Sequence, residues 1–479
     1  MSASSPDQIR RLAELIAREL SAENAGSPPP SAGPGAGLGG GVFSRLDDAV
    51  AAASAAFRGL DALGLEKRHA IIESMREAMR ESARSLAALA VEETGLGRAE
   101  DKVRKNLLVT NRTPGPEELV PRATTGDHGL VLVEPAPFGV IGAITPVTNP
   151  SSTIICNSIG MVAAGNSVVF NPHPSAKRVS RETVRLLDAA IVRAGGPPST
   201  VTCTAEPTIQ SAGELMKHPR VRLLVVTGGG AVVAAAMNSG KRAICAGPGN
   251  PPAIVDETAD IEKAGRDIVF GHSFDNNVIC TDEKEVIAVD AIADALKGAM
   301  QRAGAFELPA RDLSRLENVI FEKGAGPRGH AVVNKKFIGK DASVILKELG
   351  ITAGPEVRTV LVDVPNEHPL VWTEQMMPVL PLTRVKTASD AIDLAVAAEG
   401  ACFHTAVMHS HDIAALSAMA RRCNCSIFVK NGSNLAGLGF GGEGYTSFTI
   451  ASPTGEGLTS PRSFSRWRRC TLVDQFRIV

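Results

Sequence analysis

The chain has 479 residues, and 44% of them are hydrophobic while only 4% are aromatic. This length exceeds one ordinary domain and predicts two or three connected domains, each with an apolar core. Lysine and arginine number 50 against 51 aspartate and glutamate, which argues against nucleic acid or an anionic membrane as the main partner.

Eight cysteines are scattered along the chain, and an apolar signal segment is not apparent. This pattern indicates free thiols in a reducing cytosol. Cys423 and Cys425 form a CxC pair without a second pair at zinc-site spacing, so we predict no metal site. No apolar run is long enough to cross a bilayer, and we expect no membrane segment.

Residues 1–20 have the pattern of an amphipathic helix. Apolar side chains recur there every three or four residues, at Ile9, Leu12, Ala13, Ile16 and Leu20. Residues 21–42 are rich in Pro, Gly and small residues, which predicts a flexible linker. Two interpretations stay open for the helix: it docks on its own body, or it packs into a groove of another protein.

The remainder of the chain predicts an α/β fold. Residues 43–112 are Ala-rich and helical in pattern, and after residue 122 short apolar runs alternate with helical patterns. The runs GVIGAIT at 139–145 and VRLLVVT at 221–227 read as buried strands. This alternation predicts a parallel sheet covered by helices, as in a dinucleotide-binding domain, and a second alternating region spans 252–425.

A glycine-rich turn follows the strand-like run at 221–227. It consists of Thr227, Gly228, Gly229 and Gly230, and it opens a helical pattern. Glycines let a phosphate or ribose approach the backbone, and a helix N-terminus supplies free N–H groups. A tight turn without a ligand explains the same residues. The strand that ends at Asn171 lacks the usual carboxylate for an adenine ribose, so NAD and NADP are not separated by this rule.

The loop TPVTNPSS, residues 145–152, lies between a core strand and a helix, where α/β enzymes place functional side chains. Asn149 precedes a proline, which favours an extended backbone and a projecting side chain. Its carboxamide N–H could donate to an oxyanion, and an Asx-turn or a helix cap is the alternative.

Cys280 closes the polar loop FGHSFDNNVIC, residues 270–280, and is either a nucleophile or a buried thiol. His272 is close in sequence and could lower its pKa, but closeness in sequence is not contact. His404, His409 and His411 need no metal, because a strand that runs into a polar turn explains them. The basic run at 462–469 favours an exposed strand edge at a subunit interface over a CoA phosphate contact.

Together these segments resemble the aldehyde dehydrogenase superfamily. The resemblance rests on TPVTNP, TGGG, CAGPGNPPAIVD at 245–256, Cys280 and WTEQMMPVLPL at 372–382, and it covers residues 43–479. Within that superfamily the chain is similar to the CoA-acylating branch, the propionaldehyde and acetaldehyde dehydrogenases of bacterial microcompartments. The segment GGEGYTSFTIASPTGEG near the C-terminus is also similar to that branch.

The resemblance implies roles for individual residues. Cys280 matches the nucleophile and Asn149 the oxyanion amide, while Glu374 matches the glutamate that holds the nicotinamide ribose. The residues that it implies for cofactor binding are Thr145, Pro146, Asn171, Thr227, Gly228, Gly229, Gly230 and Glu374. Asn171 stands where many family members carry a lysine, and the triple glycine differs from the commoner form with a serine.

The resemblance also implies a domain plan and partners. Residues 43–122 and 142–247 form the NAD-binding domain, and residues 248–438 form the catalytic domain. Residues 123–141 and 439–479 form a small β oligomerisation element, so we predict a homo-oligomer. The helix at 1–20 then resembles an encapsulation peptide that docks the enzyme to a microcompartment shell protein, which predicts a cytoplasmic protein within a bacterial microcompartment.

The residues also indicate which product is formed. A cysteine thiolate adds to a short-chain aldehyde, a hydride leaves to NAD, and a thioester remains on the enzyme. Hydrolysis of that thioester needs a base for water. The resemblance implies that in hydrolytic members a glutamate occupies the motif that here reads CAGPGN at 245–250, yet no carboxylate lies between Ala231 and Pro252. We therefore predict release by coenzyme A as acyl-CoA. The alternatives are a hydrolytic aldehyde dehydrogenase that gives a carboxylic acid, or a non-catalytic shell-associated scaffold.

Overall fold

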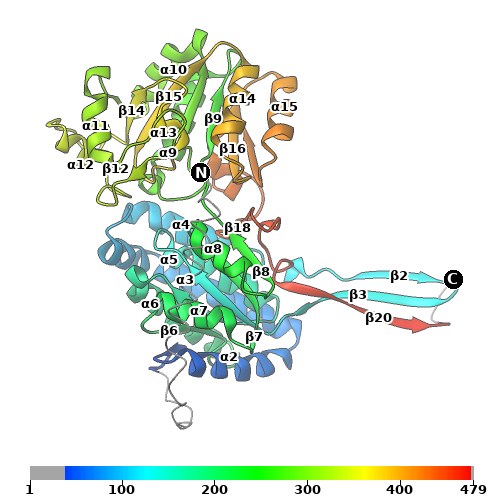
Figure 1. The fold of residues 1–479 in the computed structure, drawn as a ribbon. Helices are drawn as coiled ribbons and strands as arrows, with labels where there is room; N and C mark the ends of the chain where they lie inside the picture. The colour runs from blue at the N-terminus through cyan, green and yellow to red at the C-terminus, as the bar shows by residue number, and fades with distance from the viewer. Residues whose placement is uncertain (1–37, 476–479) are drawn as a thin grey trace.

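The computed structural model describes residues 38–475, and Figure 1 shows two α/β halves joined by the chain and an arm that projects from one of them. We call the sheet of one half the first sheet and the sheet of the other half the second sheet. Both are parallel and are covered by helices, so the chain has the α/β architecture that the alternation predicts.

The first sheet has the strand order β1-β6-β5-β4-β7-β8. Its strands are β1 (Val42–Phe43), β4 (Val140–Thr145), β5 (Ser167–Pro172), β6 (Val201–Thr204), β7 (Val221–Thr227) and β8 (Ala243–Ala246). Its helices are α2 (Leu46–Asp61), α3 (Leu65–Thr94), α4 (Ala99–Arg112), α5 (Pro150–Ala163), α6 (Lys177–Arg193), α7 (Ile209–Lys217) and α8 (Gly230–Met237). Strand β4 is buried along its whole length, which fits a central strand with helices on both faces.

The second sheet has the order β11-β14-β15-β10-β9-β16-β17. Its strands are β9 (Pro252–Val255), β10 (Glu285–Val289), β11 (Ala305–Glu307), β14 (Thr359–Asp363), β15 (Val379–Val385), β16 (Thr405–His409) and β17 (Ile427–Lys430). Its helices are α9 (Ile261–Ser273), α10 (Asp290–Arg302), α11 (Leu313–Ile320), α12 (Ala342–Glu348), α13 (Pro369–Trp372), α14 (Ala388–Ala398) and α15 (Ile413–Cys423). Two small hairpins complete the halves: β12 (Phe321–Lys323) with β13 (Val332–Val333), and β18 (Ile450–Ala451) with β19 (Gly457–Leu458).

The arm is a three-stranded antiparallel ribbon, β2-β3-β20, which extends away from the first sheet (Figure 1). It consists of β2 (Arg122–Gly126), β3 (Gly129–Pro137) and β20 (Ser465–Val473). Apart from Ser465, the residues of β20 are exposed, including Trp467 at 47% and Val473 at 70%. The basic run at 462–469 thus leads into an exposed edge strand, as the sequence predicts.

The body of the protein begins earlier than the sequence suggests. Val42, which we expect to end the linker, lies in β1 and is 7% exposed, and it pairs with Cys203 of β6. The backbone N–H of Leu38 donates to the carbonyl of Val42 at 2.8 Å. The predicted helix at 1–20 lies outside the described residues. Among residues 38–475, none of the helices has both the length and the apolar character that a membrane span requires.

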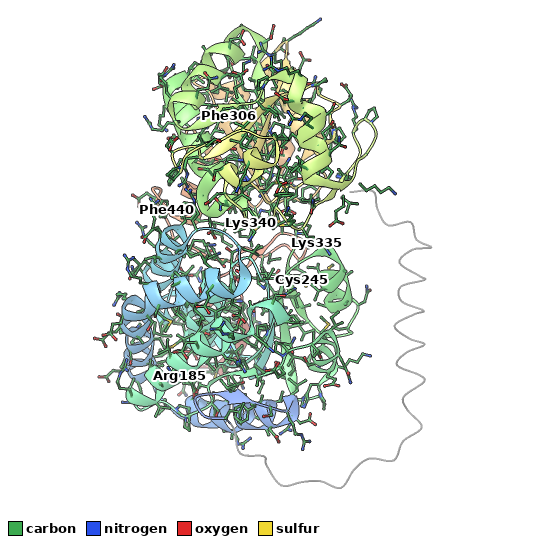
Figure 2. The ribbon with its side chains drawn as sticks, turned by 90° about the vertical axis from the view of Figure 1, so that its left-hand side faces the viewer. Arg185, Cys245, Phe306, Lys335, Lys340 and Phe440 are labelled. Atoms are coloured by element: carbon green, nitrogen blue, oxygen red, sulfur yellow. The ribbon has the colours of Figure 1, made fainter. Side chains whose placement is uncertain are left out.

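Side-chain contacts join the two halves at their boundary. Lys340 of the second half donates to the carbonyl of Gly95 at 2.6 Å. The Arg104 guanidinium of α4 lies 4.8 Å from the ring centre of Phe440, which in turn stacks on Phe270 of α9. Figure 2 shows Lys340 and Phe440 at this boundary. The loops that follow strands of the first sheet are thereby held beside the loops that precede strands of the second.

Candidate active site

Cys280 lies in the second half, in the loop between α9 and β10, where it follows the short 3-10 turn η3 (Phe274–Asn277). Its side chain is half-buried, whereas all of its loop neighbours from 271 to 279 are buried. Three successive residues have a left-handed backbone, with φ of 48° at Asp275, 57° at Asn276 and 65° at Asn277. Consecutive left-handed residues other than glycine are strained, and they persist only where side-chain contacts hold them.

Such contacts hold each of these residues. The Asn276 amide donates to the carbonyl of Gly339 at 3.0 Å and to Asp341 at 2.9 Å. The Asn277 amide donates to the carbonyl of His272 at 2.9 Å and to that of Glu283 at 3.1 Å. His272, which the sequence raised as a possible activator of Cys280, is buried in this framework, and burial lowers its pKa to about 3. It is therefore neutral and cannot stabilise a thiolate by charge.

Behind Cys280 the loop is closed by a buried lysine. The Lys284 ammonium donates to the Asn277 side chain at 2.7 Å and to the carbonyls of Asn277 and Ile279 at 2.9 and 3.3 Å. Asp282 accepts from the backbone N–H of Ile279 at 3.0 Å. These contacts fix the backbone on both sides of the thiol.

Asp275 connects this loop to the first half. Its carboxylate accepts from Lys102 at 2.9 Å, from Lys105, and from the backbone N–H of Arg98 at 2.7 Å. All three donors belong to α4 or its first residue outside the helix. Lys105 also donates to the side-chain oxygen of Asn149 at 2.5 Å. The predicted oxyanion residue and the cysteine loop are therefore bridged by a single lysine.

Asn149 is 8% exposed and is the N-cap residue of α5, but its side chain makes no capping hydrogen bond. Its side-chain N–H donates to Thr148 at 3.2 Å. A carboxamide has two N–H groups, and the structure gives a partner to one of them. The other is available as a donor, which fits the oxyanion interpretation better than the helix-cap alternative.

The electrostatic environment keeps Cys280 protonated at neutral pH. Burial raises the pKa of the thiol to about 12, the carboxylate of Glu374 adds to this rise, and Lys284 opposes it. Burial also raises the pKa of Glu374, and a hydrogen bond from the backbone of Gly249 acts in the opposite direction. Glu374 is thus close to both the thiol and the segment that precedes β9, as a residue at the active site would be. The thiol needs a base before it can attack.

His404 is a base that sequence reasoning considered only as a metal ligand. A Cβ built on Gly249 would lie 2.9 Å from the imidazole of His404 and 3.0 Å from the carbonyl oxygen of Cys280, so the three residues are adjacent. Burial lowers the pKa of His404 to about 4, and its Nε2 has no hydrogen-bond partner among the described residues. No signal in the sequence links it to Cys280, because the two are brought together by the pairing of distant strands.

The turn at 227–230 lies at the carboxyl end of β7 in the first sheet. Thr227 hydrogen-bonds to the hydroxyl of Thr449 at 3.0 Å, and the N–H of Gly228 donates to Ala246 at 3.1 Å. Gly229 and Gly230 are exposed and begin α8. This end of the sheet is where open α/β folds bind nucleotides, because the order of successive strands reverses between β4 and β7.

The other predicted cofactor residues lie at the same edge. Thr145 ends β4 and is buried, and Pro146 follows it. Asn171 near the end of β5 is placed beside them by the strand register, but its side chain is already engaged. Its oxygen accepts from Thr204 at 3.2 Å and from Ser211 at 2.6 Å, so it ties β5 to β6 and α7. The structure thus gives Asn171 a structural role that the sequence did not suggest.

The next question is whether a carboxylate near the site is available to activate a water molecule. Glu374 and Asp282 are the carboxylates whose charges raise the pKa of Cys280, and each accepts a backbone N–H. Burial raises the pKa of Cys245 to about 11, and the charge of Glu456 in the C-terminal segment adds to this rise. Glu456 also accepts a hydrogen bond from Thr454 at 2.5 Å. The segment from 231 to 252 contributes no carboxylate.

Two further features bear on ligands. Within residues 38–475, no group of three His, Cys, Asp or Glu side chains is arranged to hold a metal ion. A cavity of about 610 Å³ lies at the carboxyl ends of β10 and β15, where its lining includes Asp290, Trp372 and Arg384. Cys280 precedes the amino end of β10, so this cavity belongs to the opposite edge of the second sheet.

Comparison with known proteins gives the chain a family. Residues 43–456 match the model of the aldehyde dehydrogenase family. The chain is 51% identical over 440 residues to EutE, an acetaldehyde dehydrogenase (acetylating) of Escherichia coli K12, and the match covers 92% of this chain and 94% of that protein.

Two solved structures are also similar. One is a propionaldehyde dehydrogenase of Rhodopseudomonas palustris with bound CoA and an acylated cysteine, at a TM-score of 0.89 and 47% identity, covering 92% of this chain and 100% of that one. The other is a propionaldehyde dehydrogenase from the fucose utilisation microcompartment of Clostridium phytofermentans, at a TM-score of 0.88 and 44% identity, with the same coverage of 92% and 100%.

Proposed function

The chain belongs to the aldehyde dehydrogenase family, and we propose that it oxidises a short-chain aldehyde with NAD and transfers the acyl group to coenzyme A. The observation that carries this proposal is Cys280, a half-buried thiol fixed beside Glu374 and His404 at the boundary between two α/β halves. The similar proteins support it, because one is named as acetylating and another holds CoA and an acylated cysteine.

The first step is attack by the Cys280 sulfur on the aldehyde carbon. The thiol proton passes through the neutral imidazole of His404 to solvent, because a pKa of about 12 leaves very little thiolate at neutral pH. The new oxyanion accepts hydrogen bonds from the free N–H of Asn149 and the backbone N–H of Cys280. Such donors act strongly in a site that is screened from water.

NAD supplies the hydride acceptor. Glu374 would hold the nicotinamide ribose of NAD, and the exposed backbone of Gly229 and Gly230 at the start of α8 would take its phosphates. The remaining cofactor contacts come from Thr145, Pro146 and Thr227. The acyl group is left on the Cys280 sulfur as a thioester.

Release by a thiol is favoured over release by water. The carboxylates close to Cys280 already accept backbone hydrogen bonds, and the segment at 231–252 supplies none. His404 is neutral and has a free ring nitrogen, so it can take the proton of an incoming CoA thiol. The acyl-CoA then leaves, and Cys280 takes up a proton again.

The same chemistry fits aldehydes of two or three carbons. The similar proteins are named for acetaldehyde and propionaldehyde, and one of them comes from a microcompartment. We place this enzyme in a bacterial microcompartment, with residues 1–20 as the segment that binds a shell protein.

We also propose a homo-oligomer in which the arm adds to a second copy. Strand β20 pairs with β3 and forms one edge of the arm, with Trp467 and Val473 exposed, and α8 carries exposed Met237. Long exposed edge strands are normally covered. Trp467→Glu should therefore lower the mass measured by light scattering, and an unchanged mass would count against the arm as the interface.

The deciding experiment follows NADH formation from propionaldehyde and NAD, with and without CoA. We expect turnover that requires CoA in the native chain and is lost in Cys280→Ala. Cys402→Ala is the matched control, because Cys402 is another half-buried loop thiol. Steady turnover without CoA, with a carboxylic acid as product, would assign the enzyme to the hydrolytic branch. No turnover of any aldehyde by the native chain would favour a scaffold.

The role of the N-terminal segment needs its own test. A deletion of residues 1–37 keeps Leu38 and the turn that leads into β1, both of which belong to the folded body. We expect this deletion to retain full activity and to abolish co-purification with shell proteins. Unchanged shell recovery would remove the encapsulation proposal.

A further inference from the structure

Helix α4 buries two lysines that meet one carboxylate. Lys102 and Lys105 are each 2% exposed, and both ammonium groups contact Asp275. Asp275 can neutralise one of these charges fully, and burial of a second ammonium is costly. The presence of Lys105 therefore calls for a partner beyond Asp275.

The second partner of Lys105 is the side-chain oxygen of Asn149, at 2.5 Å. An ammonium group is only a donor, so it can face the oxygen of a carboxamide and never its N–H groups. Lys105 thus dictates which side of the Asn149 amide is oxygen. The N–H groups are turned to the other side, where one meets Thr148 and one is left as a donor.

The charge of Lys105 also changes the strength of that donor. A charged donor on an amide oxygen draws electron density from the amide nitrogen, and its N–H groups become better donors. Hydrogen bonds that involve an ion are roughly twice as strong as neutral ones. The effect is retained because the site is buried and the local dielectric is low.

We propose that Lys105 is a positioning residue that orients and polarises the Asn149 amide, so that it stabilises the oxyanion formed when Cys280 attacks an aldehyde. The inference rests on the proposed function, in which Asn149 is the oxyanion donor. Lys105 touches no reacting atom and acts through Asn149. Its contact with Asp275 fixes the position of the Asn149 amide relative to the loop that carries Cys280.

Lys102 is a matched control for this role. It lies one helical turn earlier on α4, is equally buried and contacts the same Asp275. Its other contact is the carbonyl of Thr148 at 3.2 Å and not the Asn149 amide. Lys102→Met and Lys105→Met therefore remove the same kind of ion pair, but only the second releases the amide.

The test is a double-mutant cycle on kcat for CoA-dependent NADH formation. Loss of an oxyanion donor costs roughly 100- to 1,000-fold, so Asn149→Ala should fall in that range and Lys105→Met should lower kcat about 10- to 100-fold with little change in KM. In the Asn149→Ala background, Lys105→Met should change kcat less than about threefold. Lys102→Met should have the same small effect in both backgrounds.

Equal losses for Lys102→Met and Lys105→Met that add to Asn149→Ala would show a purely structural role and overturn the proposal. Full activity in Asn149→Ala would instead remove the oxyanion assignment on which it rests. Turnover that does not need CoA would contradict the proposed function, but the double-mutant cycle on kcat would still test the role of Lys105.

A second variant keeps the proposal testable if Lys105→Met does not fold. Asn149→Asp removes the N–H donor and gives Lys105 a carboxylate partner. We expect it to lose kcat as Asn149→Ala does and to unfold at a temperature equal to or above that of the native chain. A clear fall in the unfolding temperature would show that Lys105 does not hold residue 149.

Discussion

The two segments that carry the site are built in opposite ways. The loop at 274–284 has three successive left-handed residues, and each of them has a side chain in buried hydrogen bonds. The turn at 227–230 has three glycines, two of them exposed, and one side-chain contact from Thr227. Side-chain hydrogen bonds hold the backbone of the first segment, whereas Gly229 and Gly230 of the second segment are exposed.

This difference follows from what each segment must do. A nucleophile has to be held within a fraction of an ångström of its reactive position, which needs a rigid frame around it. A backbone that binds phosphate needs free N–H groups and space, so the contacts missing from the turn are those that a ligand supplies. The comparison predicts that changes in the loop cost stability, whereas changes in the turn are tolerated by the fold.

The largest loss of stability is expected when the negative charge of Asp275 is removed from the loop at 274–284. Asp275→Asn leaves two buried lysines without a counter-ion, and removal of one partner of a buried pair costs about 3–5 kcal/mol. We expect a loss of that size in the free energy of unfolding measured with denaturant. The control is Glu262→Gln, which removes the exposed ion pair with Arg302 and should cost less than about 0.5 kcal/mol. Similar losses for both variants would contradict the comparison.

A pair of glycine substitutions applies the same steric change to both segments. A Cβ at Gly271, three residues before η3, would lie 2.2 Å from Glu283 and Ser433, whereas a Cβ at Gly229 would meet no atom within 4 Å. Gly271→Ala should therefore lower the free energy of unfolding by about 1–3 kcal/mol through overpacking. Gly229→Ala should leave it within about 0.5 kcal/mol. If Gly229→Ala proved the more damaging variant, the turn would not be open.

The alkylation rate of the Cys280 thiol measures the electrostatics of the loop at 274–284. The pKa of Cys280 is raised to about 12 by burial and by Glu374, so its alkylation by iodoacetamide should quicken about tenfold per pH unit between pH 8 and 10. Glu374→Gln removes a negative charge, lowers the thiol pKa, and should speed alkylation by up to about tenfold at a fixed pH. Glu456→Gln, whose charge acts on Cys245, should leave the rate unchanged. Equal rates in all three proteins would mean that Glu374 is not close to the thiol.

The smallest effect is expected in the turn itself. Thr227→Val removes the hydroxyl contact with Thr449, and a neutral hydrogen bond of this kind contributes about 0.5–1.5 kcal/mol. Thr227→Ser keeps the hydroxyl and should behave as the native chain does. Thermal unfolding of the two variants measures the difference. A loss in Thr227→Val as large as that in Asp275→Asn would erase the contrast between the segments.

The sequence predicted the parts of this site that local pattern encodes. Strand β7 matches the expected run at 221–227, and the helix expected after the turn begins at Gly230. Continuous apolar runs and glycine turns are local signals. The family, the α/β fold and the acylating chemistry are confirmed by comparison, with residues 43–456 matching the family model.

The sequence did not predict the contacts that hold the site. Lys102 and Lys105 lie in the stretch expected to be helical, and no local pattern links them to Asp275, which is 173 and 170 residues away. His404 drew notice only through its neighbouring histidines, although the fold sets it beside Cys280. Asn171 shows the converse case, since the side chain of a predicted cofactor residue also accepts hydrogen bonds from Thr204 and Ser211. Long-range polar pairing leaves no periodic signal in one sequence.

The ion pairs between the halves have a consequence for motion. Lys102 and Lys105 with Asp275, Arg98 with Asp341 at 2.9 Å and Arg358 with Asp101 at 3.4 Å all span the boundary. A hinge that opened the halves would separate several charges at once, at a cost of about 3–5 kcal/mol for each buried pair. The two halves of the enzyme therefore keep a fixed relative position and do not open about a hinge. NAD and CoA therefore enter and leave without an opening of the two halves.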